Sequence, residues 1–495
     1  MTLYFSSILA LLLVVTSFIR IDSGNPVKRY HQHQERPGEA DLDPCAVCDK
    51  SGLCTHLPII VIDTQGKRIP GRRTDDARSY WLSEDGFADT IVSISVIDMP
   101  GTWTHADDAP THVSQARFRY RGNSSRSHRK GSYRVVLTED DKREKKKKLP
   151  LLGMAPGSDW ALYGPFMDKS LVRNYVWMNM SAEIMGYAPN VRYCEVIING
   201  EYRGLYILME SIDMQPGRVD LTPYRDGDPT VSYLLRVSYD NKTPRDIHDF
   251  CYYTNKWETA VLEVRYPGLP NQNEYVHDYI TTDINAFEKH LFSADMFGKP
   301  GFYKNFINID SFINLYMLME FVMEGDTFQK STYLYKDVRG KLHVGPVWDF
   351  NNVFGNTELP QNEEDTFILK KRSWYGRLLQ DRDFTERVIR RWRELRTGIL
   401  AEEKLVRYHR EVEQWLGSAI TRNFEVWDFC FDPDRLRHIE RCNPAEDSDL
   451  TIYDLNPQSY AEAVDWLVES MVNRGRWMDD HIEALRQYSH PSRKT

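Results

Sequence analysis

Short apolar stretches bounded by turn-forming residues recur through the first half of the chain, and this pattern is typical of β-strands. The expected strands are residues 59–63, 91–97, 116–121, 133–137, 191–198 and 202–209. Two of them, 191–198 and 202–209, flank Asn199-Gly200, a dipeptide that favours a tight hairpin turn. The first half of the chain is therefore predicted to be rich in β-structure.

Apolar residues recur every three or four positions from residue 273 onward, which predicts amphipathic helices. The expected helices are residues 274–292, 311–323, 384–397, 402–424 and 461–488. An earlier helix is expected to begin near Asp168 or Ser170, either of which would cap it, and to end at Met185 before Gly186. The combined pattern predicts an α+β fold.

Two short β-segments follow the apolar helix at 311–323. They span 332–335 and 341–347, and the turn at 336–340 contains the Asp and Gly that such a hairpin favours. Asp326 and Asp349 bracket this hairpin. The hairpin is therefore expected to hold two carboxylates close to one site.

Two carboxylates in this arrangement match the layout of phosphoryl-transfer sites. One Asp orients the acceptor hydroxyl, and a later Asp holds the Mg²⁺ that binds the nucleotide phosphates. Asp326 is the candidate for the first role and Asp349 for the second. Ser331 stands five positions after Asp326, where protein kinases place a metal-binding Asn, and is a candidate oxygen ligand. Two Asp residues at this spacing are common, so spacing alone leaves a purely structural role open.

A second candidate site is the segment RGNSS, which lies between the strands expected at 116–121 and 133–137. Its backbone N–H groups and hydroxyls would suit a polyphosphate, and nearby cationic side chains add positive charge. An ordinary polar hairpin is the alternative for this segment taken by itself. The candidate phosphate-binding residues are Arg121, Asn123, Ser124, Ser125 and Lys130.

Composition narrows the function classes. The 495 residues are 41% apolar, enough for one large or two medium cores. The net charge of −9 disfavours a nucleic-acid partner, because phosphate backbones favour an excess of Lys and Arg. The apolar run at residues 8–15 predicts a signal peptide over 1–24 and hence secretion or display at the cell surface. An uncleaved membrane anchor is the alternative, because no Lys or Arg precedes this run.

A polar lead-in with a cysteine cluster is expected over residues 25–56, and its first part, 25–43, is predicted to be flexible. Cys45 and Cys48 form a Cys-x-x-Cys pair, with Cys54 nearby. Disulfides are the favoured interpretation for an exported chain, and zinc is the alternative, although no second ligand pair follows at suitable spacing. Cys430 and Cys442 are the candidates for a second bridge, whereas Cys194 lies in a strand and is expected to be packed.

Several motifs in the same order resemble the CotH family of atypical protein kinases. They include RYRGNSS at 119–125, KGSYR at 130–134, STYLYKD at 331–337 and GPVWDF at 345–350. Further matching blocks lie at 57–70, 151–174, 185–212 and 378–384, so the resemblance covers roughly residues 57–428. Several independent motifs in the same order make the resemblance more specific than any single motif would.

The resemblance implies a two-lobed, kinase-like fold. A β-rich nucleotide-binding lobe would span 57–213, a mainly helical catalytic lobe 214–428, and a helical extension 429–495. ATP with Mg²⁺ or Mn²⁺ would bind between the lobes, and the phosphate would pass to Ser or Thr of a secreted or surface protein. Lys130 matches the first lysine of a family Lys-Lys pair and is the leading candidate to meet the phosphates, with Arg121 as its rival. Glu210, at the end of a strand that looks like a kinase hinge, is expected either near the adenine or as a structural charge.

One position departs from the family pattern. Family members generally read Trp-Asp-Phe-Asp, and this chain has Asn351 where the second Asp stands. An amide oxygen can bind Mg²⁺ but without the carboxylate charge, so Asn351 is retained as a candidate metal ligand that would weaken the site. The alternatives are a catalytically silent surface protein acting in adhesion or coat assembly, and transfer of a nucleotide from the same pocket. A hydrolase built on paired carboxylates would leave the phosphate loop without a role.

Overall fold

The computed structural model describes residues 36–45, 52–74, 79–122, 124–126, 128–239, 243, 246–247, 260–293, 296, 302–356, 366–440 and 457–490. The described chain is a mixed α+β protein, as predicted. The predicted signal peptide lies outside the described residues. No helix among these residues is both long and apolar enough to cross a bilayer.

A closed β-barrel forms the first part of the described chain, and its strands run in the order β2-β3-β5-β6-β7-β9-β8. Parallel pairing of β2 with β8 closes the barrel, and the neighbouring strands pair antiparallel. Large side chains fill the interior, among them the buried Phe118, Tyr133, Trp160 and Tyr206. The barrel strands are β2 (Ile59–Asp63), β3 (Thr90–Ile97), β5 (His112–Tyr120), β6 (Tyr133–Thr138), β7 (Asp159–Tyr163), β8 (Val191–Ile198) and β9 (Glu201–Glu210).

A 5-stranded sheet lies apart from the barrel, in the order β11-β12-β10-β13-β14. Its strands are β10 (Tyr233–Tyr239), β11 (Asp246–Ile247), β12 (Ala260–Tyr266), β13 (Tyr333–Lys336) and β14 (His343–Val344). Strands β13 and β14 pair antiparallel and form the predicted hairpin between Asp326 and Asp349. The residues of this sheet fall within the predicted mainly helical lobe, together with the α-helices between residues 274 and 427, and the bounds of that lobe stay a prediction. A separate antiparallel pair joins β1 (Cys54–Thr55) to β4 (Thr104–His105).

The helices follow the predicted order with one break. The helix expected at 402–424 divides at Gly417, whose positive φ of 51° ends α7 and lets α8 start in a new direction. The α-helices are α2 (Arg173–Met185), α3 (Glu274–Phe292), α4 (Ile309–Val322), α5 (Ser373–Leu378), α6 (Arg382–Thr397), α7 (Glu402–Leu416), α8 (Ser418–Trp427), α9 (Pro433–Glu440) and α10 (Tyr460–His481). Short 3₁₀ helices include η2 (Glu39–Asp41), η3 (Ser124–Arg126), η4 (Leu151–Gly153), η5 (Leu269–Asn271), η7 (Phe302–Asn305), η8 (Phe350–Asn352), η9 (Asp428–Phe431) and η11 (Ile482–Tyr488).

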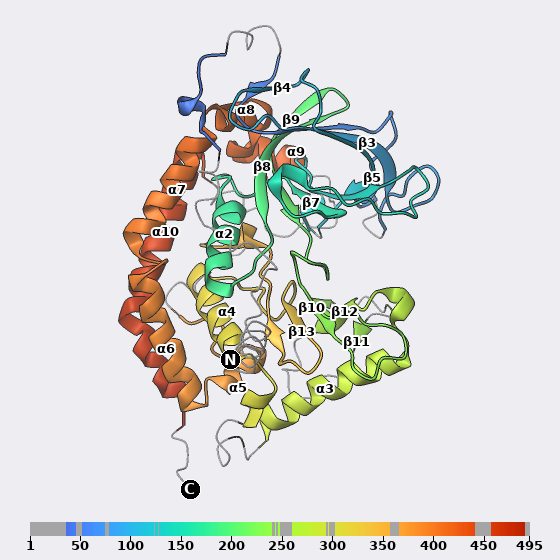
Figure 1. Ribbon diagram of the computed structural model, residues 1–495. Coiled ribbons are helices and arrows are strands. Elements are labelled where there is room, and N and C mark those ends of the chain that lie inside the picture. The colour runs from blue at the N-terminus through green and yellow to red at the C-terminus, as the bar shows by residue number, and fades with distance from the viewer. Residues whose placement is uncertain are drawn as a thin grey trace, which may run out of the picture.

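Figure 1 shows the barrel at the top, the second sheet with α3 at the lower right, and α6, α7 and α10 along the left side. The C-terminal helices pack on both parts of the molecule. Asn423 of α8 accepts hydrogen bonds from Lys130 and from the backbone of Leu205, so α8 packs on the barrel. Arg474 of α10 pairs with Glu320 of α4 inside the core. The predicted boundaries at 213/214 and 428/429 stay predictions, and side-chain contacts cross both of them.

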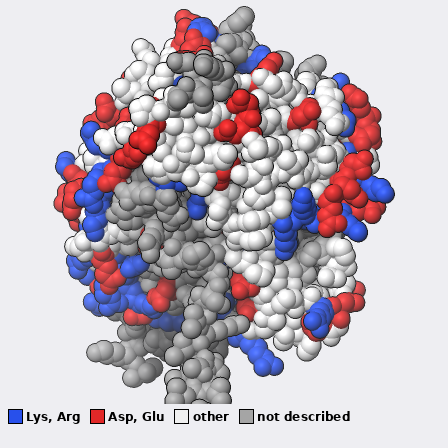
Figure 2. All heavy atoms as spheres, turned by 45° about the horizontal axis from the view of Figure 1, so that its top comes forward, with Lys and Arg blue, Asp and Glu red and all other residues white. Residues whose placement is uncertain are grey.

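The described part of the lead-in packs against the helices, contrary to the prediction that it is flexible up to residue 43. Trp415 Nε1 donates to the Arg36 carbonyl at 3.1 Å, and the Ser418 N–H donates to Glu39 Oε2 at 3.0 Å. Cys54 is disulfide-bonded, and Cys194 is buried in the barrel as a packed residue. The bridge proposed between Cys430 and Cys442 extends outside the described residues. Around the face in Figure 2, acidic and basic side chains are interspersed, with a largely uncharged area between them.

Candidate active site

Helix α4 brings the chain into the candidate site. Asn308 caps its first turn by accepting the Ser311 N–H at 3.0 Å, and Met323 ends it in the left-handed conformation. The chain then turns toward the β13–β14 hairpin and forms a small cavity with it. The cavity-lining residues are Leu315, Met319, Glu324, Asp326, Thr327, Lys330, Ser331, Thr332, Tyr333, Gly345, Pro346, Val347, Trp348 and Asp349. Asp326, Ser331 and Asp349 therefore share one cavity, as the sequence predicted.

Asp326 lies between a cation and a buried acid. Lys330 Nζ lies 3.0 Å from Asp326 Oδ2, and the backbone N–H of Asp326 donates to Glu324 Oε1 at 2.9 Å. Burial, reinforced by the nearby charges of Asp326 and Asp349, raises the pKa of Glu324 to about 8. The sequence analysis missed Glu324. Its place directly after a long apolar helix was an available signal, because an acid there is buried at considerable cost unless it has a function or a partner.

Asp349 has a strained backbone and a hydroxyl neighbour. Its φ of 65° is in the left-handed region, which is uncommon for a residue with a Cβ, and Ser331 has a φ of 55°. Ser331 Oγ donates to Asp349 Oδ2 at 3.2 Å. Solvent reaches part of the Asp349 side chain. The protein around the carboxylate nevertheless shields it from water and so raises its pKa, and the positive charge of Arg121 opposes that rise. Two oxygen-bearing side chains thus converge where the sequence predicted a metal.

The N-terminus of α2 holds the Asp349 segment in place. Asn174 Oδ1 accepts the backbone N–H of Phe350 at 3.0 Å, and Arg173 Nε donates to the Val353 carbonyl at 3.1 Å. Arg173 is itself fixed by a buried ion pair with Asp168, with 2.7 Å between Nη1 and Oδ1. The sequence alone leaves open whether Arg173 and Asn174 bind a ligand or hold the fold together. These contacts give them a positioning role on both sides of η8.

Arg121, the residue directly after β5, lies beside Asp349. Arg121 Cζ is 5.0 Å from the centre of the Trp348 ring, a cation–π contact. Burial lowers the pKa of Arg121, and Asp349 is the main charge that opposes the change. Burial also lowers the pKa of Arg119, and repulsion from Arg134 adds to the effect. Arg134 is itself paired with Asp159, so Arg121 is the arginine that faces the Asp349 segment.

The loop after Arg121 is tightly folded. Gly122 has a φ of 106°, and a Cβ at this position would collide with Ser125 Oγ. Ser125 Oγ donates to the Arg121 carbonyl at 3.4 Å, so its hydroxyl is engaged within the loop. Asn123 lies outside the described residues, and for Ser124 the structure describes the backbone within η3 only. The predicted roles of Asn123, Ser124 and Ser125 as phosphate ligands stay predictions.

Lys130 points away from the predicted phosphate site. Its ammonium is buried and donates to Asn423 Oδ1 at 2.5 Å, with the Tyr206 ring 5.2 Å away. Burial lowers the pKa of Lys130 to about 7. In this structure the Lys130 side chain is part of the contact between the barrel and α8, and its predicted role as the lysine that meets the phosphates stays a prediction. Arg121, the rival, is the residue that lies beside Asp349.

Two further predicted ligands have other partners. Glu210 is fully buried, and its two carboxylate oxygens accept hydrogen bonds from the backbone and the side chain of Asn190 at 2.7 and 3.1 Å. This favours the structural alternative for Glu210 over contact with adenine. Asn351 donates from Nδ2 to Asn352 Oδ1 at 2.7 Å and is not among the residues that line the cavity. The prediction that Asn351 binds the metal is not supported by its position.

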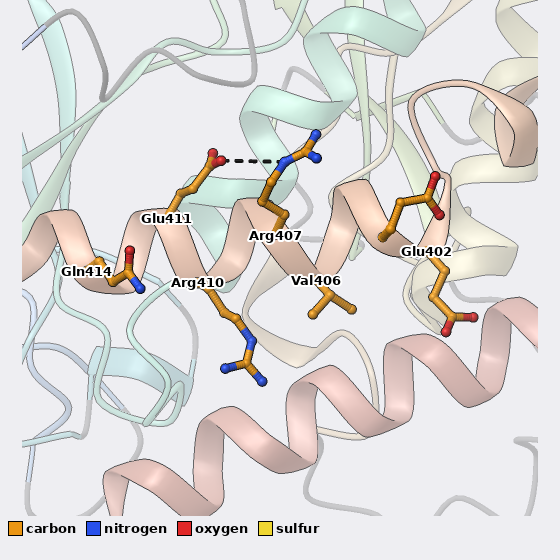
Figure 3. Close-up of a pocket in the computed structure, with 7 residues that line it drawn as sticks. Glu402, Val406, Arg407, Arg410, Glu411 and Gln414 are labelled. Carbon is orange, nitrogen blue, oxygen red and sulfur yellow. Dashed lines mark ion pairs between the residues drawn. The ribbon is translucent and has the colours of Figure 1, made fainter.

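A second hollow lies on the surface of α7, where Figure 3 shows its side chains beside a neighbouring helix. Its lining residues are Glu402, Glu403, Val406, Arg407, Arg410, Glu411 and Gln414. Arg407 and Glu411 form an ion pair at 3.5 Å across one helical turn. Charged residues of one helix that pair with each other are the ordinary solvated face of an amphipathic helix. We therefore assign the candidate site to the cavity at Asp326 and Asp349.

Comparison with known proteins identifies the family of the chain. The chain is similar to the inner spore coat protein H of Bacillus subtilis (strain 168), with 20% identity over 370 residues. That match covers 74% of this chain and 87% of the relative. The family model described as CotH kinase protein matches residues 118–478, a range that contains Arg121, Asp326 and Asp349. Because this match spans most of the chain, the protein belongs to the CotH family.

Proposed function

We propose that the protein is an ATP-dependent protein kinase. The observation that carries the proposal is the meeting of Asp326 and Asp349 in one cavity, with Arg121 near Asp349. Two carboxylates supply a site for the acceptor hydroxyl and a site for a metal, and the arginine supplies charge for phosphates. The proposed substrates are ATP and Ser or Thr of a secreted or surface protein, as expected from the family resemblance.

The residues present fit a hard divalent cation. Mg²⁺ prefers oxygen ligands and keeps several waters, so it needs only one or two protein carboxylates. Asp349 offers a carboxylate and Ser331 a hydroxyl oxygen, 3.2 Å apart. Bound Mg²⁺ would neutralise charge on the nucleotide phosphates. Mn²⁺ prefers similar ligands and is the alternative ion.

The remaining chemistry belongs to the side chains. The acceptor oxygen attacks the γ-phosphorus, the bond to the β–γ bridging oxygen breaks, and ADP leaves with that oxygen. Asp326 accepts the proton that the acceptor hydroxyl loses, and Lys330, 3.0 Å away, orients this carboxylate. Arg121 stabilises the negative charge spread over the phosphate oxygens. Arg173 and Asn174 keep the Asp349 segment fixed during this step.

The test is phosphate transfer from γ-labelled ATP by the full-length protein with Mg²⁺ or Mn²⁺. Autophosphorylation and a generic protein acceptor are both scored. We expect wild-type protein to transfer label, Asp326→Ala to lose transfer but keep the melting shift caused by MgATP, and Asp349→Ala to lose both. Asp310→Ala is the matched control, because Asp310 lies in the exposed first turn of α4 and pairs with Arg387. Equal transfer by wild type and both cavity variants would overturn the proposal.

A catalytically silent surface or coat protein is the second candidate. The name of the relative, an inner spore coat protein, favours it. Its expected result is correct folding with neither label transfer nor a melting shift on addition of ATP and metal.

Transfer of a nucleotide instead of a phosphate would appear in intact mass as a much heavier added group.

A further inference from the structure

The strand pair β1–β4 brings a cysteine and a histidine together on the edge of the molecule away from the kinase cavity. Cys54 and His105 are cross-strand partners in this pair. Cys45, from the end of the lead-in, adds a second sulfur, with 3.2 Å between its Sγ and His105 Nε2. One ligand atom from each of the three residues lies within 4.8 Å of the other two.

This spacing suits a zinc ion. Zinc binds thiolate sulfur at about 2.3 Å and imidazole nitrogen at about 2.0 Å, so two tetrahedral ligand atoms lie roughly 3.5–4 Å apart. The three atoms are close enough to surround one ion with small side-chain movements. The sequence had disfavoured zinc because no second ligand pair follows the Cys-x-x-Cys. The structure supplies His105 instead, from a strand far along the chain.

The surroundings of His105 are those of a metal ligand. Asp108 Oδ2 lies 3.3 Å from His105 Nδ1 and accepts the His105 backbone N–H at 2.7 Å. A carboxylate on one ring nitrogen fixes the proton there and leaves the other nitrogen as the donor atom, as is usual for zinc-binding histidines. The imidazole is 8% exposed, so it is largely shielded from competing water. Trp103 Nε1 donates to the Asp43 carbonyl at 2.7 Å and holds the lead-in beside β4.

We propose that Cys45, Cys54 and His105 form a zinc site that is controlled by thiol oxidation. In the structure Cys54 is disulfide-bonded, so its sulfur can bind a metal only after that bond is reduced. A dithiol reduces the disulfide to the Cys54 thiol and the thiol of the cysteine bonded to it, and is itself oxidised to a disulfide. Zinc then binds the Cys45 and Cys54 thiolates and His105 Nε2, and the two thiol protons pass to solvent. Oxidation by a disulfide reverses the exchange and releases the ion.

The proposed consequence is that bound zinc reversibly fixes the lead-in to the rest of the protein. Arg36 and Glu39 of the same segment bind α7 and the start of α8, so a bond at Cys45 would connect the β1–β4 pair with those helices. Zinc should therefore raise the melting temperature of the reduced protein. The site is separate from the kinase cavity, so its test is independent of the proposed kinase activity.

The experiment measures zinc by mass spectrometry in full-length protein that was reduced with a phosphine, loaded with ZnCl₂ and desalted. We expect about one zinc per chain in reduced wild type, at least ten-fold less in Cys45→Ser and His105→Ala, and wild-type content in Cys194→Ser. Asp108→Asn should keep the site but weaken zinc affinity about 10–100-fold. Oxidised wild type should hold no zinc.

Cobalt keeps the proposal testable even if a variant folds poorly. Reduced wild type loaded with Co²⁺ should show a thiolate-to-cobalt charge-transfer band that disappears on addition of zinc. Circular dichroism of each variant checks that its fold is intact. Reduced wild type without zinc and without the cobalt band, or folded Cys45→Ser and His105→Ala variants that retain full zinc, would overturn the proposal.

Discussion

Replacing Arg474 with Met should destabilise the protein in a pH-dependent way. Arg474 of α10 is 2% exposed and pairs with the fully buried Glu320 of α4, with 3.2 Å between Nη2 and Oε2. It also donates to the carbonyls of Glu320 and Thr366 at 3.1 and 2.9 Å. Removing one member of a buried ion pair costs about 3–5 kcal/mol, because the other charge stays buried without its partner. We expect the free energy of unfolding to fall by about this amount at pH 8.

The pH dependence follows from Glu320. Burial raises the pKa of Glu320 from 4.5 to about 7, and Arg474 only partly opposes that rise. The folded protein therefore holds this proton more tightly than the unfolded chain. The corresponding stability is fully present below pH 4.5 and is lost as the pH rises through about 7, an effect of about 3 kcal/mol. Without Arg474 the pKa rises further, so Arg474→Met should lose less stability at pH 5.5 than at pH 8.

Urea unfolding followed by tryptophan fluorescence at both pH values measures the effect. Arg476→Met is the matched control on the same helix, because Arg476 forms an exposed ion pair with Glu402 and such pairs add little stability. Adding Glu320→Gln to Arg474→Met should restore part of the loss at pH 8, since no charge is then buried. An Arg474→Met protein as stable as wild type at pH 8, or equally destabilised at both pH values, would refute the reasoning.

Three further predictions concern the candidate site. Arg121→Met should raise the KM for ATP at least ten-fold, as measured by steady-state kinetics. Lys130→Met should leave this KM within two-fold of wild type and lower the melting temperature, as measured by calorimetry. A raised KM in Lys130→Met with an unchanged KM in Arg121→Met would restore Lys130 to the phosphate site. Asp349→Asn should keep the fold but lose the Mg²⁺ dependence of ATP binding, measured by titration calorimetry; unchanged dependence would remove Asp349 from the metal site. Asn351→Asp should leave the Mg²⁺ dependence unchanged, because Asn351 bonds to its neighbour outside the cavity; tighter Mg²⁺ binding would show that residue 351 contacts the metal.

Local chemistry made much of the fold predictable. The Asn199-Gly200 turn has the positive φ angles, 52° and 79°, that a tight hairpin requires. Gly186 ends α2 in the left-handed conformation, and the hairpin between Asp326 and Asp349 forms where its turn residues stand. In each case the signal lies within a few residues of the feature. The sequence therefore indicated correctly which two carboxylates share a site.

Contacts between segments far apart in the chain determine the features that could not be predicted from the sequence. Lys130 and Arg121 are both cationic and flank one loop, so no local pattern distinguishes them. Lys130 donates a hydrogen bond to Asn423, which belongs to a helix near the other end of the chain. Arg121 makes a cation–π contact with Trp348, next to the hairpin. The closure of the barrel by β2 and β8 is another pairing between distant segments. Such choices follow from the folded context rather than from residue type.

Glu320 and Glu324, the two acids in the apolar α4 segment, show both the local pattern and the long-range packing. Glu320 and Glu324 lie one helical turn apart, the first inside α4 and the second just beyond its end, in a stretch that is otherwise mostly apolar. An apolar pattern explains why the helix is buried, but it gives no reason for a carboxylate there, and burying one is costly. Glu320 has a structural reason in Arg474, which fixes α10 to α4. Glu324 has no cationic partner among the described contacts, and one oxygen holds the Asp326 backbone. Its pKa of about 8 keeps Glu324 mostly protonated at neutral pH, so this acid is buried next to the proposed base without adding a further full negative charge to the cavity.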